Sequence, residues 1–188
     1  MAEGPGHALI VGGTGMLAAA ADRLAQDGWR VSHIARHAMA FAESREGQAG
    51  FDADYHDEAA FRAALAAALE WGGPPGLGIA WFRTLKLPTP RLMAEAMGAP
   101  DASARLFQVV GSRTAHPNHP DRLPRAAAVA EGLPNCLLRQ VVLGFRLEPA
   151  GARANTNAEI SAGVLEAIAA DRPLTIVGQV DPWPLDRA

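Results

Sequence analysis

Apolar and polar positions follow one another along this chain in blocks that predict a regular alternation of strands and helices. The short apolar runs have the length and composition of strands buried in a parallel sheet. The clearest helical block is 58–71, in which Phe61, Leu65 and Leu69 recur on one face. The expected strands are 8–11, 31–35, 50–54, 77–82, 106–110, 136–143 and 174–177. This alternation predicts a parallel sheet of about seven strands with helices on both faces.

Polar residues and glycines mark where several helices begin and end. Asp57 is placed to cap helix 58–71, and Thr156 with Glu159 forms a capping box at the start of the last helix. The expected helices are 16–26, 38–45, 58–71, 91–97, 125–130 and 157–170, with a polar loop over 112–124. Because crossovers between parallel strands are right-handed, we expect an α/β, doubly wound Rossmann fold.

The junction between the first strand and the first helix carries a cluster of glycines. A pyrophosphate must approach bare backbone N–H groups, and glycine leaves them open. The helix that follows directs its unpaired N–H groups and its positive dipole end toward such an anion. The candidate cofactor-binding residues of this turn are Gly12, Gly13, Thr14, Gly15, Met16 and Leu17. The alternative interpretation is a glycine turn in a sheet protein that binds no nucleotide.

Two further residues bear on which dinucleotide the chain would bind. Arg36 follows the second strand, where an acidic residue would bind the ribose diol and an arginine can receive a 2′-phosphate. Asp54 closes the third strand, where its carboxylate can accept a hydrogen bond from the adenine amino group. Arg36, which is followed by His37, favours NADP(H) over NAD(H). In the alternative interpretation, Arg36 meets only solvent and Asp54 caps the segment that follows it.

Composition adds little to this picture but argues against several partners. The 188 residues are 49% hydrophobic and 20% charged, and the net charge of −3 argues against nucleic acid or an anionic membrane as the main partner. No apolar run approaches the ~20 residues that span a membrane. Cys136 is the only cysteine, which fits a reducing compartment. We therefore expect a cytoplasmic protein in which residues 1–188 form one dinucleotide-binding domain.

These motifs resemble the short-chain dehydrogenase/reductase family. The glycine turn, Arg36, Asp54 and the expected strand order stand at the matching places. More closely, the chain is similar to a small bacterial subgroup of short-chain-dehydrogenase-like Rossmann proteins of poorly defined activity. The segments that carry this similarity are 11–17, 54–56, 80–81, 110–112, 139–141, 143–145, 157–164 and 182–183. The resemblance covers essentially the whole chain and implies the fold and a nucleotide site, but no particular reaction.

The residues that usually perform the family's chemistry are only partly present. Members usually carry a serine after the fifth strand, which Ser112 matches, and a Tyr-x-x-x-Lys pair on the next helix. That tyrosine donates a proton to a carbonyl oxygen, while the lysine lowers its pKa and binds the ribose. Here the only tyrosine is Tyr55, after the third strand, and the only lysine is Lys86. The pair is absent, and 80–83 replaces the usual Asn-Asn-Ala-Gly segment.

Other polar residues at the carboxyl ends of strands are candidates for replacing the missing acid. Those expected near the nicotinamide position are Trp81, Arg83, Ser112, Arg113 and Arg139. We take Ser112, His116 and Arg139 as candidate catalytic residues and Trp81 as a further cofactor-binding residue. His116, in the polar loop with His119, can supply a proton near neutral pH, and an arginine can stabilise an oxyanion.

Each of these candidates also has a structural interpretation. His116 lies among prolines in a loop and can simply face solvent, Arg139 can pair with a structural carboxylate, and Trp81 can pack in the core. Cys136 is expected to pack as a small apolar side chain. His116 and His119 lack further ligands at a recognised spacing, so we expect no metal site.

The sequence thus predicts an atypical NADP(H)-binding oxidoreductase of short-chain dehydrogenase type that acts on a small polar substrate. The alternative from another class is a non-catalytic dinucleotide-binding regulatory or scaffold protein, which the missing Tyr-x-x-x-Lys pair favours. A third hypothesis is a Rossmann enzyme of other chemistry, such as an enzyme acting on a nucleotide sugar or an isomerase-like enzyme, in which the cofactor is not consumed. By analogy with related folds, which often pair through the helices flanking the sheet, we expect a homo-oligomer.

Overall fold

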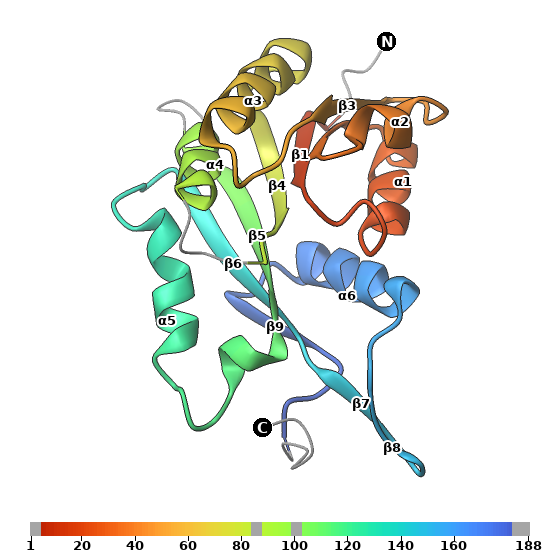
Figure 1. Ribbon diagram of the computed structural model, residues 1–188, viewed down its shortest axis with the longest axis vertical. Helices are drawn as coiled ribbons and strands as arrows, with labels where there is room; N and C mark the ends of the chain where they lie inside the picture. The colour runs from red at the N-terminus through yellow and green to blue at the C-terminus, as the bar shows by residue number, and fades with distance from the viewer. Residues whose placement is uncertain (1–4, 84–87, 99–102, 182–188) are drawn as a thin grey trace.

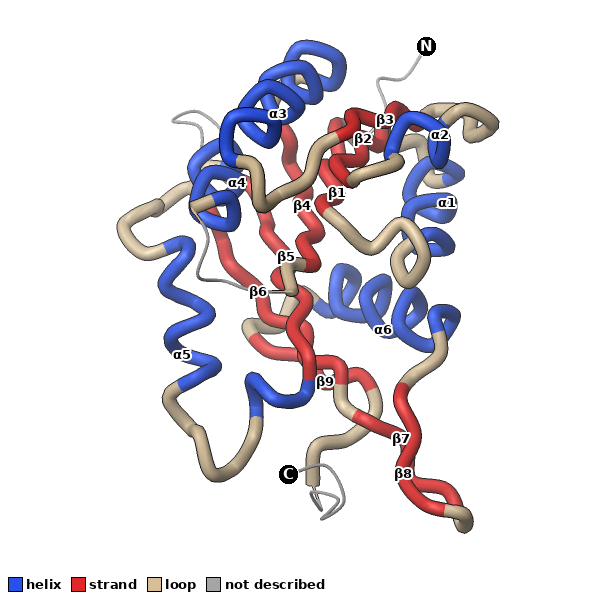
Figure 2. The backbone as a smooth tube through the Cα atoms, viewed as in Figure 1, coloured by secondary structure: helices blue, strands red, loops and turns tan. Residues whose placement is uncertain are grey.

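Seven parallel strands form the sheet at the centre of the computed structural model, which describes residues 5–83, 88–98 and 103–181 (Figures 1 and 2). The strands are β1 (His7–Val11), β2 (Arg30–Ala35), β3 (Gln48–Asp52), β4 (Pro75–Trp81), β5 (Ala104–Gly111), β6 (Cys136–Leu143) and β9 (Leu174–Val177). Their order in the sheet is β3-β2-β1-β4-β5-β6-β9, and every pairing is parallel. The strand order therefore reverses between β1 and β4, and the expected doubly wound Rossmann fold is confirmed.

Helices cover both faces of this sheet. They are α1 (Ala18–Gln26), α2 (Ala38–Ala42), α3 (Glu58–Gly72), α4 (Thr89–Met97), α5 (Arg122–Ala127) and α6 (Asn157–Ala170). Figure 1 shows α3, α4 and α5 on one side of the strands and α1, α2 and α6 on the other. No helix in the described segments is both long and apolar enough to cross a membrane.

The two helical layers bury alternate side chains of the same strands. On β1, Leu9 and Val11 pack with α3 and α4, whereas Ala8 and Ile10 pack with α1 and α6. These four side chains are at most 1% exposed, because a strand buried on both faces directs successive side chains into opposite layers. Burial on both faces of the sheet explains why the strands appear in the sequence as near-continuous apolar runs.

Most of the predicted elements are found within a few residues of their expected bounds. Asp57 caps α3 by accepting a hydrogen bond from the Ala60 amide, and Thr156 with Glu159 forms the predicted capping box of α6. The bounds predicted for β6 and β9 are those of the structure. The segments 182–183 and 86, on which the sequence analysis also drew, lie outside the described residues.

Three segments differ from the prediction. β3 begins and ends two residues earlier than expected, because the weakly patterned start Gln48-Ala49-Gly50 is a strand only through its pairing with β2. α5 begins at Arg122 rather than 125. Pro124 lies in its first turn, where backbone N–H groups have no partner within the helix, so the N–H that proline lacks is not needed there. The hairpin of β7 (Phe145–Glu148) and β8 (Gly151–Ala154) was not predicted, and it projects from the body of the molecule (Figure 2).

Candidate functional site

The turn from β1 to α1 requires glycine at two positions. Gly12 and Gly13 have φ angles of +71° and +68°, in the left-handed region that side chains disfavour. A Cβ on Gly12 would also lie 2.5 Å from the carbonyl oxygen of Trp81, and one on Gly13 would lie 2.7 Å from Cδ1 of Leu17. The first two glycines of the motif are therefore required by the fold itself, whatever the turn binds.

The remainder of this turn is open. Gly15 is exposed, and a Cβ there would meet only Nδ2 of Asn157, at 3.7 Å. Among the described residues, no hydrogen-bond acceptor is recorded for the backbone N–H groups of 13–16. The N–H of Leu17, in contrast, donates to the carbonyl of Gly13 at 2.7 Å, and the Leu17 side chain is buried. Unpaired amides in front of a helix form a surface that suits an anion.

A second helix holds this turn in place. The hydroxyl of Ser161, in α6, donates a hydrogen bond of 2.8 Å to the carbonyl of Met16. Asn157, the first residue of α6, lies beside Gly15. Figure 1 shows the loop between β1 and α1 lying against α6. The turn therefore sits at the carboxyl end of β1, at the reversal of strand order where Rossmann folds bind their ligands.

Arg36 and Asp54 lie at the ends of the two neighbouring strands. Arg36 directly follows β2, and Asp54 lies two residues beyond β3, both with exposed side chains. Oδ1 of Asp54 accepts hydrogen bonds from the backbone N–H of His56 (2.9 Å) and from its Nδ1 (2.8 Å). These bonds, helped by the charge of Arg36, lower the pKa of Asp54. Asp54 thus does cap the turn after it, as the alternative interpretation expects, and remains exposed beside Arg36.

A cleft of about 830 Å³ opens at the carboxyl ends of β4 and β5. Its apolar wall includes Trp81, the last residue of β4, and the buried residues Phe82, Val110 and Ala126. The backbone of Trp81 supports Gly12, so one residue borders both the glycine turn and the cleft. The volume of the cleft falls in the range of pockets that hold small molecules.

Polar side chains also line the cleft. They come from the end of β4, from the 3-10 turn Ser112–Ala115 after β5, and from α5. The basic and hydroxyl-bearing lining residues are Arg83, Ser112, Arg113, Thr114, Arg122 and Arg125. Ser112 and Trp81 therefore both line this cleft. Arg122 and Arg125 were missed, although their spacing of three residues would have placed them on one face of a helix begun earlier.

The other two candidate catalytic residues lie elsewhere. His116 is not among the residues that line the cleft; its Nδ1 accepts a hydrogen bond from the Asn118 amide at 3.1 Å. Arg139 lies in the middle of β6, four positions before the strand's carboxyl end, and its Nε donates to Oδ1 of Asp171 at 3.0 Å. For Arg139 the structural interpretation, pairing with a carboxylate, is the observed one.

Cys136 also takes the structural place expected of it. The side chain is buried against the α3–α4 layer, and this burial raises the thiol pKa to about 11. A thiol with so high a pKa is protonated near neutral pH and is a poor nucleophile.

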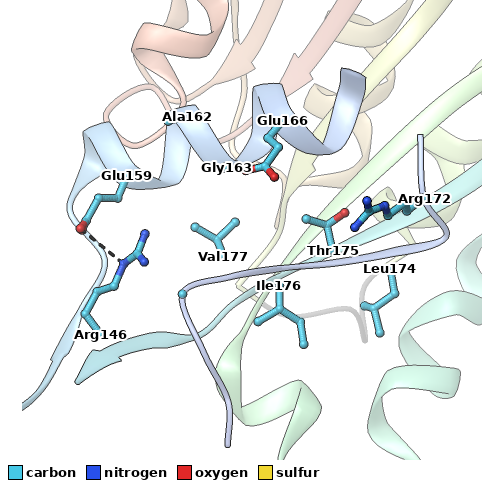
Figure 3. A pocket seen from close by; sticks show the side chains of 11 residues that line it. Arg146, Glu159, Ala162, Gly163, Glu166, Arg172, Leu174, Thr175, Ile176 and Val177 are labelled. Carbon is cyan, nitrogen blue, oxygen red and sulfur yellow. Dashed lines mark ion pairs between the residues drawn. The ribbon is translucent and has the colours of Figure 1, made fainter. Parts of the chain in front are cut away.

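A second hollow, of about 560 Å³, lies between α6 and the edge strand β9 (Figure 3). Its charged residues have both signs, and Arg146 pairs with Glu159 across it at 3.4 Å. Hydrogen bonds from Arg153 lower the pKa of Glu159 to about 2, so this carboxylate is already engaged. None of the lining residues belongs to the glycine turn. The cleft at β4 and β5 is therefore the better candidate for a ligand site.

Comparisons with known proteins support the fold. No protein-family model and no curated protein sequence matches this chain. Among solved structures, a Serratia marcescens short-chain dehydrogenase/reductase double mutant is similar over 95% of this chain and 99% of its own, with 15% identity and a TM-score of 0.70. An apo SCOR enzyme from Clostridium thermocellum covers 95% of this chain and 92% of its own, with 17% identity and a TM-score of 0.69.

A third similar structure is an Aeromonas hydrophila protein described as a short chain dehydrogenase/reductase family oxidoreductase. It shares 20% identity over 92% of this chain and 96% of its own, with a TM-score of 0.60. At these identities the likeness establishes a shared architecture, which is that of short-chain dehydrogenase/reductase structures. Activity has to be argued from the site.

Proposed function

We propose that this protein binds a nicotinamide dinucleotide, NADP(H) in preference to NAD(H), and acts as an atypical oxidoreductase on a small polar substrate. The observation that carries the proposal is the glycine turn with unpaired amides at the reversal of strand order. The short-chain dehydrogenase/reductase proteins named above have the same architecture, and this likeness supports the assignment.

The residues of this edge fit such a dinucleotide. The N–H groups of 13–16 suit a pyrophosphate, because no hydrogen-bond acceptor is recorded for them among the described residues and Gly15 adds no side chain in front of them. Arg36 is exposed after β2, where its guanidinium can take a 2′-phosphate, and Asp54 is exposed after β3, where its carboxylate can accept a hydrogen bond from an adenine. No neighbouring carboxylate within the described segments is recorded as an ion-pair partner of Arg36.

Residues of the cleft can contribute to the reaction at the nicotinamide end of the dinucleotide. A bound nicotinamide supplies or accepts a hydride. The hydroxyl of Ser112 can donate a hydrogen bond to a substrate oxygen, and the arginines of the cleft can stabilise negative charge on that oxygen. Trp81 and Phe82 give this region an apolar wall. We leave His116 and Arg139 out of the proposed machinery because neither lines the cleft.

The second candidate is a dinucleotide-binding regulatory protein without turnover. It is favoured by the position of the only tyrosine. The Tyr55 hydroxyl accepts a hydrogen bond of 3.3 Å from the backbone N–H of Arg83, and α5 contains no tyrosine or lysine. Assays of hydride transfer with a panel of carbonyl, enone and imine substrates separate the two, since the regulatory protein would bind NADPH and oxidise none of it.

Titration with NADPH and NADH, followed by tryptophan fluorescence, tests dinucleotide binding. We expect a saturable fluorescence change with NADPH, because Trp81 borders both the glycine turn and the cleft. Gly15→Ala should weaken binding by at least tenfold and leave unfolding unchanged, since the new Cβ meets no protein atom closer than 3.7 Å. Gly76→Ala, whose Cβ would meet no atom within 4 Å, is the matched control. Absence of saturable binding with both dinucleotides would refute the proposal.

The preference for the phosphorylated dinucleotide rests on Arg36. Arg36→Ala should weaken NADPH binding roughly tenfold, about 1.4 kcal/mol, and leave NADH binding nearly unchanged, because a charge-assisted hydrogen bond is lost only with the 2′-phosphate. Equal losses for the two dinucleotides would show that Arg36 does not distinguish them.

A further inference from the structure

The cleft at β4 and β5 has a charge opposite to that of the whole chain. The protein carries a net charge of −3, yet four arginines line this cleft: Arg83, Arg113, Arg122 and Arg125. No aspartate or glutamate is among the described residues that line it. A concave site with one sign of charge over an apolar wall concentrates ligands of the opposite sign.

Three of these arginines also lack the carboxylate partners that many other arginines of the molecule have. Only Arg125 pairs, with Asp121 at 3.1 Å, and its side chain remains 80% exposed. For the other three, no carboxylate of the described segments lies within ion-pair distance. By comparison, Arg62 lies 2.7 Å from Glu58 and Arg91 lies 2.9 Å from Glu95. Gathering like charges is unfavourable, and an anion in the cleft would reverse that cost.

The helix that carries two of the arginines is anchored to the sheet by buried amides. Nε2 of Gln108, whose residue is 2% exposed, donates to the carbonyl of Ala126 at 2.8 Å. Nε2 of Gln140 donates to the carbonyl of Leu123 at 3.1 Å and to Oε1 of Gln108 at 3.0 Å. These bonds tie α5 to β5 and β6. The backbone from which Arg122 and Arg125 extend is therefore held before any ligand arrives.

A further contact joins the two basic segments. Nη1 of Arg122 donates a hydrogen bond of 3.2 Å to the carbonyl of Arg113, in the 3-10 turn after β5. The guanidinium of Arg122 is thereby held at the side of the cleft where Arg113 and Ser112 begin the turn. A planar guanidinium presents several donors in a fixed geometry that matches the two oxygens of a carboxylate or a phosphate.

From this arrangement we propose that the substrate is a small organic acid, whose carboxylate or phosphate group is bound by Arg122 with Arg113 and Arg125. Its apolar part lies against Trp81 and Val110, and Ser112 donates a hydrogen bond to the oxygen on the carbon that gains or loses the hydride. That the bound acid is a substrate rests on the proposed oxidoreductase function. The oxyanion site itself depends only on the cleft.

Binding of matched charged and neutral compounds tests the proposal. The full chain, labelled with ¹⁵N, is titrated with succinate and its neutral analogue succinamide, and with glycerol 3-phosphate and glycerol. The arginine Nε–H resonances report binding directly. We expect saturable shifts of the Arg122 resonance with at least one anion, and none with the neutral analogues. Neutral compounds that bind as tightly as the anions would overturn the proposal.

Three variants locate the site. Arg122→Gln should weaken anion binding at least tenfold, and Arg122→Lys should retain part of it. Arg62→Gln, an exposed arginine on α3, is the control and should change the dissociation constant less than twofold. An unchanged dissociation constant in Arg122→Gln, with the fold intact by circular dichroism, would rule out the assigned site.

Competition separates the substrate from the dinucleotide. If adenosine 2′,5′-bisphosphate displaces succinate from the cleft, the arginines bind the nucleotide's own phosphates and the proposal is wrong. If succinate still binds when NADPH is saturating, the proposal is supported. Should NADPH fail to bind while succinate binding depends on Arg122, the oxidoreductase function fails and the oxyanion site stands.

Discussion

The two halves of the carboxyl edge are built in different ways. On the side of β1, β2 and β3, the candidate nucleotide site consists mainly of backbone, held by left-handed φ angles at Gly12 and Gly13. On the side of β4, β5 and α5, the cleft is defined by side chains, with exposed arginines on a 3-10 turn and a six-residue helix. Trp81 lies between them and borders both.

This contrast explains why one half tolerates little change and the other offers specificity. A backbone site binds a group that is common to many dinucleotides, and its geometry is inseparable from the strand and helix that form it. Side chains on short surface elements can be exchanged without altering the sheet, so they can select a substrate. Substitutions at Gly12 and Gly13 should therefore affect mainly stability, whereas substitutions of the cleft side chains should affect mainly binding.

The largest effect is expected from Gly12→Ala. The substitution places a Cβ 2.5 Å from the Trp81 carbonyl at a φ of +71°, so both strain and a backbone clash follow. We expect a loss of about 2–4 kcal/mol in the free energy of unfolding. Urea denaturation measures it, with Gly76→Ala as the control in β4. A Gly12→Ala protein as stable as the wild type would show that the fold does not require glycine at this turn.

The second-largest effect is a loss of stability at acidic pH that originates on the side of β1, β2 and β3. His33 of β2 is 2% exposed, and burial lowers its pKa to about 4. Because this folded-state pKa lies below the unfolded value, the unfolded chain takes up the proton more readily. Stability is therefore complete above pH 6.5 and falls as the pH decreases toward 4, by about 2 kcal/mol at pH 5. Burial also lowers the pKa of His7, which adds a loss of the same sign.

Urea unfolding at several values between pH 7.5 and 4.5 measures this dependence. His33→Gln keeps an amide that can reach Gln48, the present hydrogen-bond partner of His33 at 2.7 Å, and removes the titrating group. The variant should lose less stability on acidification than the wild type. If the two proteins respond to pH alike, His33 is not the source of the dependence.

The smallest effect is expected from Arg139→Gln. Arg139 pairs with Asp171, which also lies 3.7 Å from Arg105, so the carboxylate keeps a cation when Arg139 is removed. We expect a loss of about 1 kcal/mol or less in stability, no change in succinate binding and no change in any hydride-transfer activity. A large loss of activity in a stable variant would show that Arg139 takes part in the reaction.

The sequence predicted the layered fold well because its signals are local. Apolar runs, the Asp57 cap and the Thr156–Glu159 capping box each depend on residues close together in the chain. The projecting hairpin escaped prediction, since β7 and β8 are short and carry little apolar alternation, and α5 was placed late because Pro124 was read as a loop residue.

For the site, local sequence was enough to locate the glycine turn and to place Arg36 and Asp54 after the second and third strands. A left-handed backbone favours glycine, and strand ends can be located from apolar runs. That Arg122 and Arg125 line the cleft while Arg139 and His116 do not follows from contacts that the sequence does not reveal. The side to which an arginine points depends on the register of β6 against β5 and on how Gln108 and Gln140 anchor α5, and these are contacts between residues far apart in the chain.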